Sequence, residues 1–235
     1  MCGRSSLTVT EKELEKRFNA SFYSEDLERY NPLPNFNMAP TQNLPVITDA
    51  DPDHINLYRW GLIPFWAKDE KIGYRMINAR METVAEKPAF RQAFRQRRCL
   101  WPVDGYYEWI ARGKEKIPYR VILKDKGVYS LAGLWETWKN EQGEKVFSFT
   151  ILTQPATPSM EFLHHRMPVI LPREMEFDWL DPDLDPEDFL HNLPPFGTDQ
   201  LEVYRVSQEV NNVRNNRREL IAPVTETNQG EDRKS

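Results

Sequence analysis

CLWPVDGYYEWIARGKEKIPYRVILKDKGVYSLAGL, residues 99–134, is the stretch of sequence that decides the fold. It holds three short runs rich in β-branched, aromatic and other apolar residues, at 99–103, 119–123 and 128–134. Asp, Gly and Lys separate these runs, and such a pattern is typical of strands joined by turns. This part of the chain is therefore predicted to form a sheet.

Similar runs occur on both sides of this stretch, at residues 44–48, 55–60, 146–152 and 201–206. Helical signals are fewer. Thr10 and Glu13 form a capping box ahead of Leu14 and Phe18, which are spaced four apart and predict a short amphipathic helix. Helical spacing also occurs at 82–94 and 174–180, and residues 158–164 could form a short helix or a turn. The pattern indicates a mixed, largely antiparallel α+β domain.

No internal repeat, Gly/Ser linker or change of composition divides the chain, so we expect one domain over residues 1–223. The polar segment 224–235 is expected to be a flexible tail. Residues 29–45 are rich in Pro and Asn and predict an irregular but ordered connection, which would present Asn37 and Pro40 on a loop.

Composition limits the class of protein. Hydrophobic residues make up 40% of the 235 residues, enough for a sizeable core, and the formal net charge of −5 argues against a protein that coats nucleic acid indiscriminately. With only Cys2 and Cys99, a disulfide framework is not indicated, and a reducing intracellular setting fits better. No apolar stretch approaches the roughly 20 residues that span a bilayer, so a cytoplasmic protein without a membrane partner is expected.

Cys2 is the first candidate for chemistry because removal of Met1 would leave an α-amine and a thiol on one residue. These groups titrate near ~7.7–8.0 and ~8.5, so a usable fraction of each is nucleophilic at neutral pH. A 1,2-aminothiol captures aldehydes as a five-membered thiazolidine. Gly3 would allow close approach of a ligand, and Arg4 is a potential phosphate donor. By position alone, however, Cys2 is more often an incidental cysteine.

Two further segments combine polar and aromatic groups. WGLIPFW, residues 60–66, could stack on bases, although aromatic clusters more often belong to the core. NARME, residues 78–82, brings an amide, a guanidinium and a carboxylate together, although Asn78 could equally be a turn residue.

Glu108 and His164 are the candidate proton carriers. Glu108 lies among aromatic residues in PVDGYYEW, an environment that raises a carboxyl pKa by desolvation and suits acid/base work. In His164-His165-Arg166, a histidine is close to a possible phosphate binder. A metal site is disfavoured, since adjacent histidines point apart in a strand and no CxxC is present. Glu108 taken alone is more often a surface group or an ion-pair partner.

MCGR, WGLIPFW, NAR-x-E, DGYYEW and H-x-RMP, in this order from Cys2 to about residue 171, resemble the SRAP family of SOS response-associated peptidases or abasic-site-processing proteins. The resemblance implies a single α+β domain with a barrel-like core and short flanking helices. It also implies that the mature N-terminal Cys2 binds covalently to abasic sites in single-stranded DNA, with no cofactor or metal. Asn78 would orient the amine, Glu108 would act as acid/base, and His164 would assist ring opening.

The resemblance further assigns a DNA-binding set of Arg4, Asn37, Pro40, Trp66, Arg80 and Trp109. Arg4 and Arg80 would clamp phosphates, and the other four would line the DNA channel. Ser5 departs from the aromatic residue common after CGR, and His165 replaces a frequent acidic residue. The implied protein is a monomer of the cytoplasm that joins the nucleoid on binding DNA.

Two alternative functions stay open at this point. Cys2 could be the N-terminal nucleophile of a peptidase acting mainly on its own leader, which here is only Met1. The chain could instead be a noncatalytic single-strand-binding module that uses a basic strip of Arg91, Arg95, Arg97 and Arg98.

Overall fold

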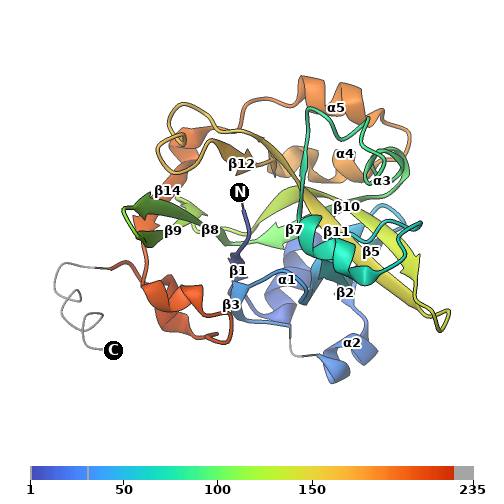
Figure 1. Ribbon diagram of the computed structural model, residues 1–235, viewed down its shortest axis with the longest axis horizontal. Helices are drawn as coiled ribbons and strands as arrows, with labels where there is room; N and C mark the ends of the chain where they lie inside the picture. The colour runs from blue at the N-terminus through green and yellow to red at the C-terminus, as the bar shows by residue number, and fades with distance from the viewer. Residues whose placement is uncertain (1, 31, 225–235) are drawn as a thin grey trace.

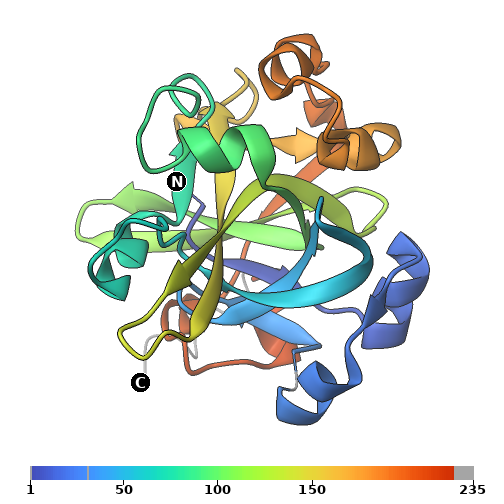
Figure 2. The same cartoon turned by 90° about the vertical axis from the view of Figure 1, so that its right-hand side faces the viewer.

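Five strands close into a small barrel in the computed structural model, which describes residues 2–30 and 32–224. The ring runs from β11 (Lys145–Pro155) through β10 (Tyr129–Lys139), β7 (Arg98–Val103) and β4 (Asn43–Thr48) to β5 (Asp51–Trp60), and β5 then pairs with β11. This closing pair is parallel, whereas the other four are antiparallel. Strand β5, light blue in Figure 2, curves around the core.

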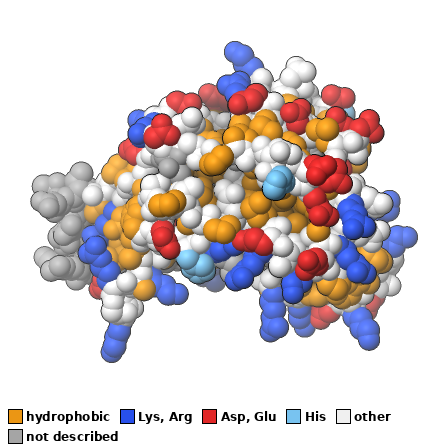
Figure 3. All heavy atoms as spheres, turned by 90° about the horizontal axis from the view of Figure 1, so that it is seen from above, with side chains coloured by type: hydrophobic (Ala, Val, Ile, Leu, Met, Phe, Trp, Pro, Cys, Tyr) orange, Lys and Arg blue, Asp and Glu red, His pale blue; other side chains and the backbone are white. Residues whose placement is uncertain are grey.

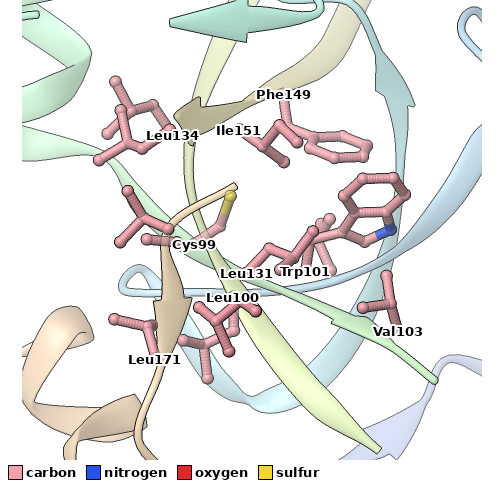
Figure 4. Packing of buried hydrophobic residues seen from close by; sticks show 14 of the residues in the cluster. Cys99, Leu100, Trp101, Val103, Leu131, Leu134, Phe149, Ile151 and Leu171 are labelled. Carbon is pink, nitrogen blue, oxygen red and sulfur yellow. The ribbon is translucent and has the colours of Figure 1, made fainter. Parts of the chain in front are cut away.

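Large aromatic side chains fill the barrel. Trp101 lies between Trp60 and Phe149, with ring centroids 4.6 and 5.3 Å away, and all three are fully buried. Figure 4 shows Cys99 and Ile151 pointing into the same packed interior. Alternation along the strands places these apolar side chains inward, and their burial stabilises the domain.

A second sheet of five strands packs against the barrel, and all of its strand pairs are antiparallel. Its order is β14 (Leu201–Arg205), β9 (Glu115–Leu123), β8 (Gly105–Arg112), β1 (Ser5–Leu7) and β3 (Asn35–Met38). Asp104 stands between β7 and β8, where the chain passes from the barrel to this sheet, and its carboxylate accepts from Ser6 and Arg120 at 2.7 and 2.8 Å. This buried network fixes strand β1, because a charge away from water is retained only with partners.

Short elements complete the fold. Strands β6 (Asn78–Arg80) and β12 (Arg166–Pro168) flank the last residues of β11, while β13 (Ile170–Leu171) pairs with β10 and β2 (Ser21–Phe22) with β5. Helices α3 (Arg91–Gln96), α4 (Glu176–Leu180) and α5 (Pro186–Asn192) cover one end, and α2 (Ser24–Arg29) lies at the other (Figure 1). Helix α1 (Glu11–Phe18) is tied to α4 by the ion pair of Arg17 with Glu176 at 2.9 Å. No described helix is long and apolar enough to cross a bilayer.

The α+β prediction with a barrel-like core is confirmed, and each of the seven predicted strands overlaps an observed one. The capping box at Thr10 starts α1 as expected, and residues 174–180 hold a 3₁₀ turn followed by α4. Residues 158–164 form turns rather than a helix. The predicted tail, 224–235, lies outside the described residues except for Val224.

Two local predictions are wrong. Residues 82–90 form turns, and helix begins only at Arg91, because Pro88 lacks the amide hydrogen that a helix interior needs. The connection 29–45 is not irregular throughout: residues 35–38 form strand β3 beside β1. Asn37 therefore sits in a strand and is buried, not on a loop.

Gly133→Ala is expected to lower the free energy of unfolding by about 1–3 kcal/mol, as overpacking a core does. A Cβ on Gly133 would lie 2.8 Å from the Cys99 Sγ and 3.0 Å from the Thr150 carbonyl oxygen. Urea unfolding measures the loss. In a Cys99→Ala background the cost of the same change should shrink, and an equal cost in both backgrounds would contradict this packing.

Candidate active site

Strand β1 carries the start of the chain to the centre of the molecule, between β8 and β12 (Figure 1). Ser5 pairs with Tyr106, and the Tyr107 amide donates to the Arg4 carbonyl at 2.9 Å. Cys2 is fully buried. Burial raises the pKa of its thiol strongly, and the nearby Glu108 carboxylate raises it further. The thiol is therefore held in its protonated form.

Asn78 holds Cys2 in place. It lies at the start of β6, and its Nδ2 donates to the Cys2 carbonyl oxygen at 2.9 Å. The Asn78 Oδ1 is buried and has no hydrogen-bond partner among the described residues. One side chain thus binds the carbonyl of residue 2 and keeps an acceptor available beside it.

Glu108 lies on β8, next to the first residues of the chain. Extending the pairing of Ser5 with Tyr106 by antiparallel register places Glu108 opposite Gly3. Its side chain is 4% exposed, and this desolvation raises the carboxyl pKa. The structure therefore brings Cys2, Asn78 and Glu108 together, and a carboxyl with a raised pKa suits proton transfer near neutral pH.

His164 precedes β12, the strand that faces the N-terminal end in Figure 1. The Arg166 amide donates to its Nδ1 at 2.9 Å, so in the neutral ring the proton is on Nε2. Desolvation is the main cause that lowers the His164 pKa, with a contribution from the charge of His165. The His165 ring stacks on His164 at 4.2 Å and is more exposed. His164 is thus held as a neutral imidazole.

Arg166 does not face a ligand. Its guanidinium binds the Glu82 carboxylate with two hydrogen bonds and the Thr153 carbonyl with a third, and its side chain is 7% exposed. The expectation of a phosphate binder next to His164 is wrong for this reason. The ion pair of Arg166 with Glu82 instead joins β12 to the chain after β6. The Arg of the H-x-R motif and the Glu of the NAR-x-E motif are residues of opposite charge, and this was the sequence signal that could have predicted the pair.

Half-buried Arg4 and buried Asn37 form one hydrogen-bonded group behind the site. The Arg4 Nη1 donates to the Asn37 Oδ1 at 2.7 Å and to the Val210 carbonyl at 2.6 Å. The Asn37 Nδ2 donates to the carbonyls of Val210, Asn212 and Asn215. Asn37 is 1% exposed, so its amide secures the segment 207–217 and does not reach the surface of a DNA channel.

The remaining four predicted DNA-binding residues differ in exposure. Trp109 is half-buried and its Nε1 donates to the Asn211 Oδ1 at 2.7 Å, with the Arg4 guanidinium 5.9 Å from its ring. Trp66 is 48% exposed in the loop after β5, Arg80 is exposed, and Pro40 is half-buried in a turn. Asn211 was missed by the sequence analysis, since an exposed Asn in a polar run carries no signal.

The basic strip considered for a binding module does not exist as one surface. Arg97 pairs with Glu136 at 2.9 Å, and Arg98 is 2% exposed with its guanidinium on the Asp181 and Leu184 carbonyls. Only Arg91 and Arg95 of the four are exposed. Figure 3 shows both acidic and basic side chains around one face of the molecule, with many of the basic ones projecting from its lower edge.

The described residues hold no group of three His, Cys, Asp or Glu side chains placed to bind a metal ion. The chemistry available at the site is that of a cysteine next to the N-terminus, an amide, a carboxyl and a neutral imidazole. These groups lie on a barrel with an attached antiparallel sheet and make up a candidate active site around residue 2 of a small α+β protein.

The family model of the SOS response associated peptidase (SRAP) matches residues 1–213, and the chain belongs to this family. "Abasic site processing protein YoqW" of Bacillus subtilis (strain 168) is 43% identical over 224 residues, 94% of this chain and 99% of that protein. "Abasic site processing protein HMCES" of Xenopus tropicalis is 30% identical, over 95% and 78%. A crystal structure of a protein from Bacteroides thetaiotaomicron superposes with a TM-score of 0.86 at 27% identity, covering 95% and 100%.

Proposed function

We propose that this protein is an abasic-site-processing enzyme that forms a covalent thiazolidine with abasic sites in single-stranded DNA through Cys2 after Met1 is removed. The observation that carries the proposal is the hydrogen bond from Asn78 to the Cys2 carbonyl, because it holds the future N-terminal residue next to Glu108. The names of the relatives YoqW and HMCES support the same substrate.

In the proposed reaction, the Cys2 amine adds to C1′ of the ring-opened sugar. The carbinolamine loses water to give an imine, with Glu108 supplying the proton to the departing oxygen. The thiol then adds to the imine carbon, and its proton goes to the nitrogen. One molecule of water is released overall. A protonated Cys2 thiol fits this order, since the amine reacts first and the thiol only closes the ring.

Asn78 and His164 have separate roles in this proposal. The Asn78 Oδ1 accepts a hydrogen bond from the Cys2 amine and aims its lone pair at the aldehyde. His164, with its proton on Nε2, donates to the sugar oxygen during ring opening. The imine could alternatively lose the C2′ proton and expel the 3′ phosphate, which would give weak lyase activity, and reversal of the crosslink follows the same steps backwards.

A denaturing gel tests the proposal. Single-stranded DNA containing one uracil is treated with a glycosylase, incubated with the protein and heated in denaturant. A shifted band that appears only with the abasic DNA is the expected result. Intact mass of the protein must show loss of Met1 in the reactive fraction. Absence of the band from protein that lacks Met1, or cleavage of peptides without any reaction on abasic DNA, would overturn the proposal. We further propose that the protein acts as a monomer in the cytoplasm and that it is associated with the nucleoid when it is bound to DNA.

Asn78→Ala is expected to slow crosslinking by about tenfold to 10²-fold, because misplacing a reacting group by about 1 Å costs up to that much. The rate of band formation under single-turnover conditions measures it. Asn192→Ala is the matched control: Asn192 also donates from Nδ2 to a carbonyl, at 2.8 Å, but lies on α5. Equal rates for the two variants would contradict the role of Asn78.

A further inference from the structure

The imidazole of His164 is held by the backbone amide of Arg166, two residues further along the chain. This amide donates to the His164 Nδ1 at 2.9 Å, and the Arg166 carbonyl oxygen lies 3.2 Å from the same nitrogen. The amide hydrogen cannot move to another atom, so Nδ1 has to accept and the neutral ring carries its proton on Nε2. Any group that fixes the Arg166 backbone therefore also fixes which nitrogen of His164 can donate to a ligand.

The strand register directs this amide toward His164. In the ladder of β11 with β12, the Ala156 amide donates to the His165 carbonyl at 3.0 Å, and Arg166 lies opposite Pro155. Hydrogen-bonded and non-hydrogen-bonded pairs alternate between antiparallel strands, so the Arg166 amide points away from β11. The amide thus lies at the outer edge of β12, and the contacts of the Arg166 side chain hold it there.

The Arg166 side chain is anchored at two points. Its Nη2 donates to the Thr153 carbonyl oxygen at 2.6 Å and to the Thr153 Oγ1 at 3.1 Å. Both amino groups of the guanidinium also bind the Glu82 carboxylate, the Nη2 at 3.0 Å. Only 7% of the Arg166 side chain is exposed, whereas 42% of the Glu82 side chain is. A nearly buried guanidinium depends on such a partner, because an unpaired charge away from water is costly.

Glu82 supplies the negative charge of this arrangement. The side-chain hydrogen bond from Arg166 is the main cause that lowers the pKa of the Glu82 carboxyl, so the carboxylate is ionised at neutral pH. Replacing the carboxylate by an amide would leave the shape of the side chain intact and remove the charge that balances the guanidinium. The anchor of Arg166 would then rest on Thr153 alone.

The segment that carries Glu82 is held independently of this ion pair. Strand β6 pairs in parallel with β11, and the Met81 amide donates to the Thr153 carbonyl oxygen at 2.9 Å. The contact of Asn78 with Cys2 lies at the start of the same strand and does not involve Glu82. Loss of the Glu82 carboxylate should therefore loosen Arg166 and leave Asn78 in place.

We propose that Glu82 is a positioning residue for His164: through Arg166 it holds the backbone amide that keeps the His164 proton on Nε2 for the oxygen of the abasic sugar. The inference rests on the proposed function. Ring opening of this sugar is an isomerisation in which the C1′–O4′ bond breaks, C1′ becomes a carbonyl carbon, and the proton of the C1′ hydroxyl ends on O4′. An Nε2–H placed at O4′ stabilises the charge that this oxygen gains as the bond breaks.

Single-turnover crosslinking to two DNA substrates tests this role. One oligonucleotide carries an abasic site, whose sugar is mostly a closed ring. The other carries an acyclic alkyl aldehyde at the same position, which needs no ring opening. Glu82→Gln is expected to slow the reaction with the abasic site about tenfold, less than the 10²- to 10⁴-fold that loss of a proton-transfer group costs. The reaction with the acyclic aldehyde should keep its wild-type rate.

A double-mutant cycle shows whether Glu82 acts through His164. In a His164→Ala background, Glu82→Gln should change the rate by less than about twofold, because the group that it positions is gone. Glu70→Gln is the matched control, since Glu70 is 47% exposed and pairs with Arg59 at 3.5 Å. It should react as wild type does with both substrates, and Glu82→Asp, which keeps the charge, should recover part of the lost rate.

The tautomer of His164 can be measured without any reaction. In ¹⁵N spectra of protein labelled at histidine, wild type should show His164 with an unprotonated Nδ1 and a protonated Nε2 at neutral pH. Glu82→Gln should show a mixture of the two neutral tautomers, because the Arg166 amide is no longer held against Nδ1. Glu70→Gln should give the wild-type spectrum.

The outcomes separate the two proposals. Suppose that wild type with Met1 removed crosslinks abasic DNA. If Glu82→Gln then reacts at the wild-type rate, is slowed equally with both substrates or costs as much in the His164→Ala background, the positioning role is wrong and the proposed function stands. If wild type crosslinks neither substrate, the proposed function fails, and the spectra still show whether Glu82 sets the tautomer. An unchanged tautomer in Glu82→Gln contradicts the positioning role whatever the rates are.

Discussion

Cys2→Ala is expected to reduce the heat-stable adduct with abasic DNA to background. Alanine at position 2 still leaves an α-amine after Met1 is removed, so an imine can form, but without a thiol no ring closes over it. The adduct should therefore become visible only when borohydride is added during the reaction to reduce the imine. Denaturing gels with and without borohydride measure the two species, and intact mass identifies each.

Cys99→Ala is the matched control, because Cys99 is the other cysteine of the chain and lies inside the barrel. It should crosslink as wild type does. Cys2→Ser should behave like Cys2→Ala, since a hydroxyl closes a much less stable ring than a thiol. A heat-stable band of wild-type intensity from Cys2→Ala without borohydride would rule out the thiazolidine.

Glu108→Gln is expected to slow crosslinking by about 10²- to 10⁴-fold, the usual contribution of a general acid or base. The amide keeps the shape of the side chain but cannot release or accept the proton that the carbinolamine requires. Single-turnover rates with abasic DNA in excess measure the effect. Glu136→Gln is the control, because Glu136 is also buried with a raised pKa but lies on β10 beside Arg97.

The pH dependence gives a second test of Glu108. Its pKa is raised, so the protonated form that acts as an acid persists to higher pH than for an ordinary glutamate and is lost as the pH rises through that value. The amine requires the opposite, becoming reactive as the pH approaches ~7.7–8.0. A bell-shaped profile is expected for wild type, and Glu108→Gln should lose the decline at high pH. A decline that persists in the variant would assign it to another group.

Seven of the strands could be predicted from sequence because each is a compact run of β-branched, aromatic and other apolar residues, whereas strand β8 (Gly105–Arg112), which carries Glu108, was not predicted. The closure of the strands into a barrel could not be predicted. The ring depends on the parallel pairing of Ser148 with Arg59, between strands separated by nearly ninety residues, and no local pattern encodes such a partner. Strand β3 was missed for a related reason: Asn37 disfavours a strand locally, and its burial is compensated by carbonyls far along the chain.

The candidate site followed from resemblance more than from residue pattern. Cys2, Asn78 and Glu108 occupy three separate segments of the sequence. The order of the family's motifs was the only sign in the sequence that they belong to one site, and the structure shows them close together. The contacts of Arg4 behind the site could not be predicted from the sequence. Its partner at Val210 is a backbone carbonyl, and any residue type supplies such a group.

The hydrogen bond between Arg4 and Val210 joins residues that are 206 positions apart in the sequence. The ribosome therefore makes these two parts of the site at different times. At about 5–20 residues per second, a ribosome needs roughly 10–40 s to travel from one to the other. Throughout that interval the nascent chain exposes its cysteine but lacks the wall that orients Arg4. The arrangement around Arg4 is therefore complete only when the last tenth of the protein has been made, and a message truncated before codon 210 would yield a chain that has Cys2 but lacks the Val210 carbonyl that orients Arg4.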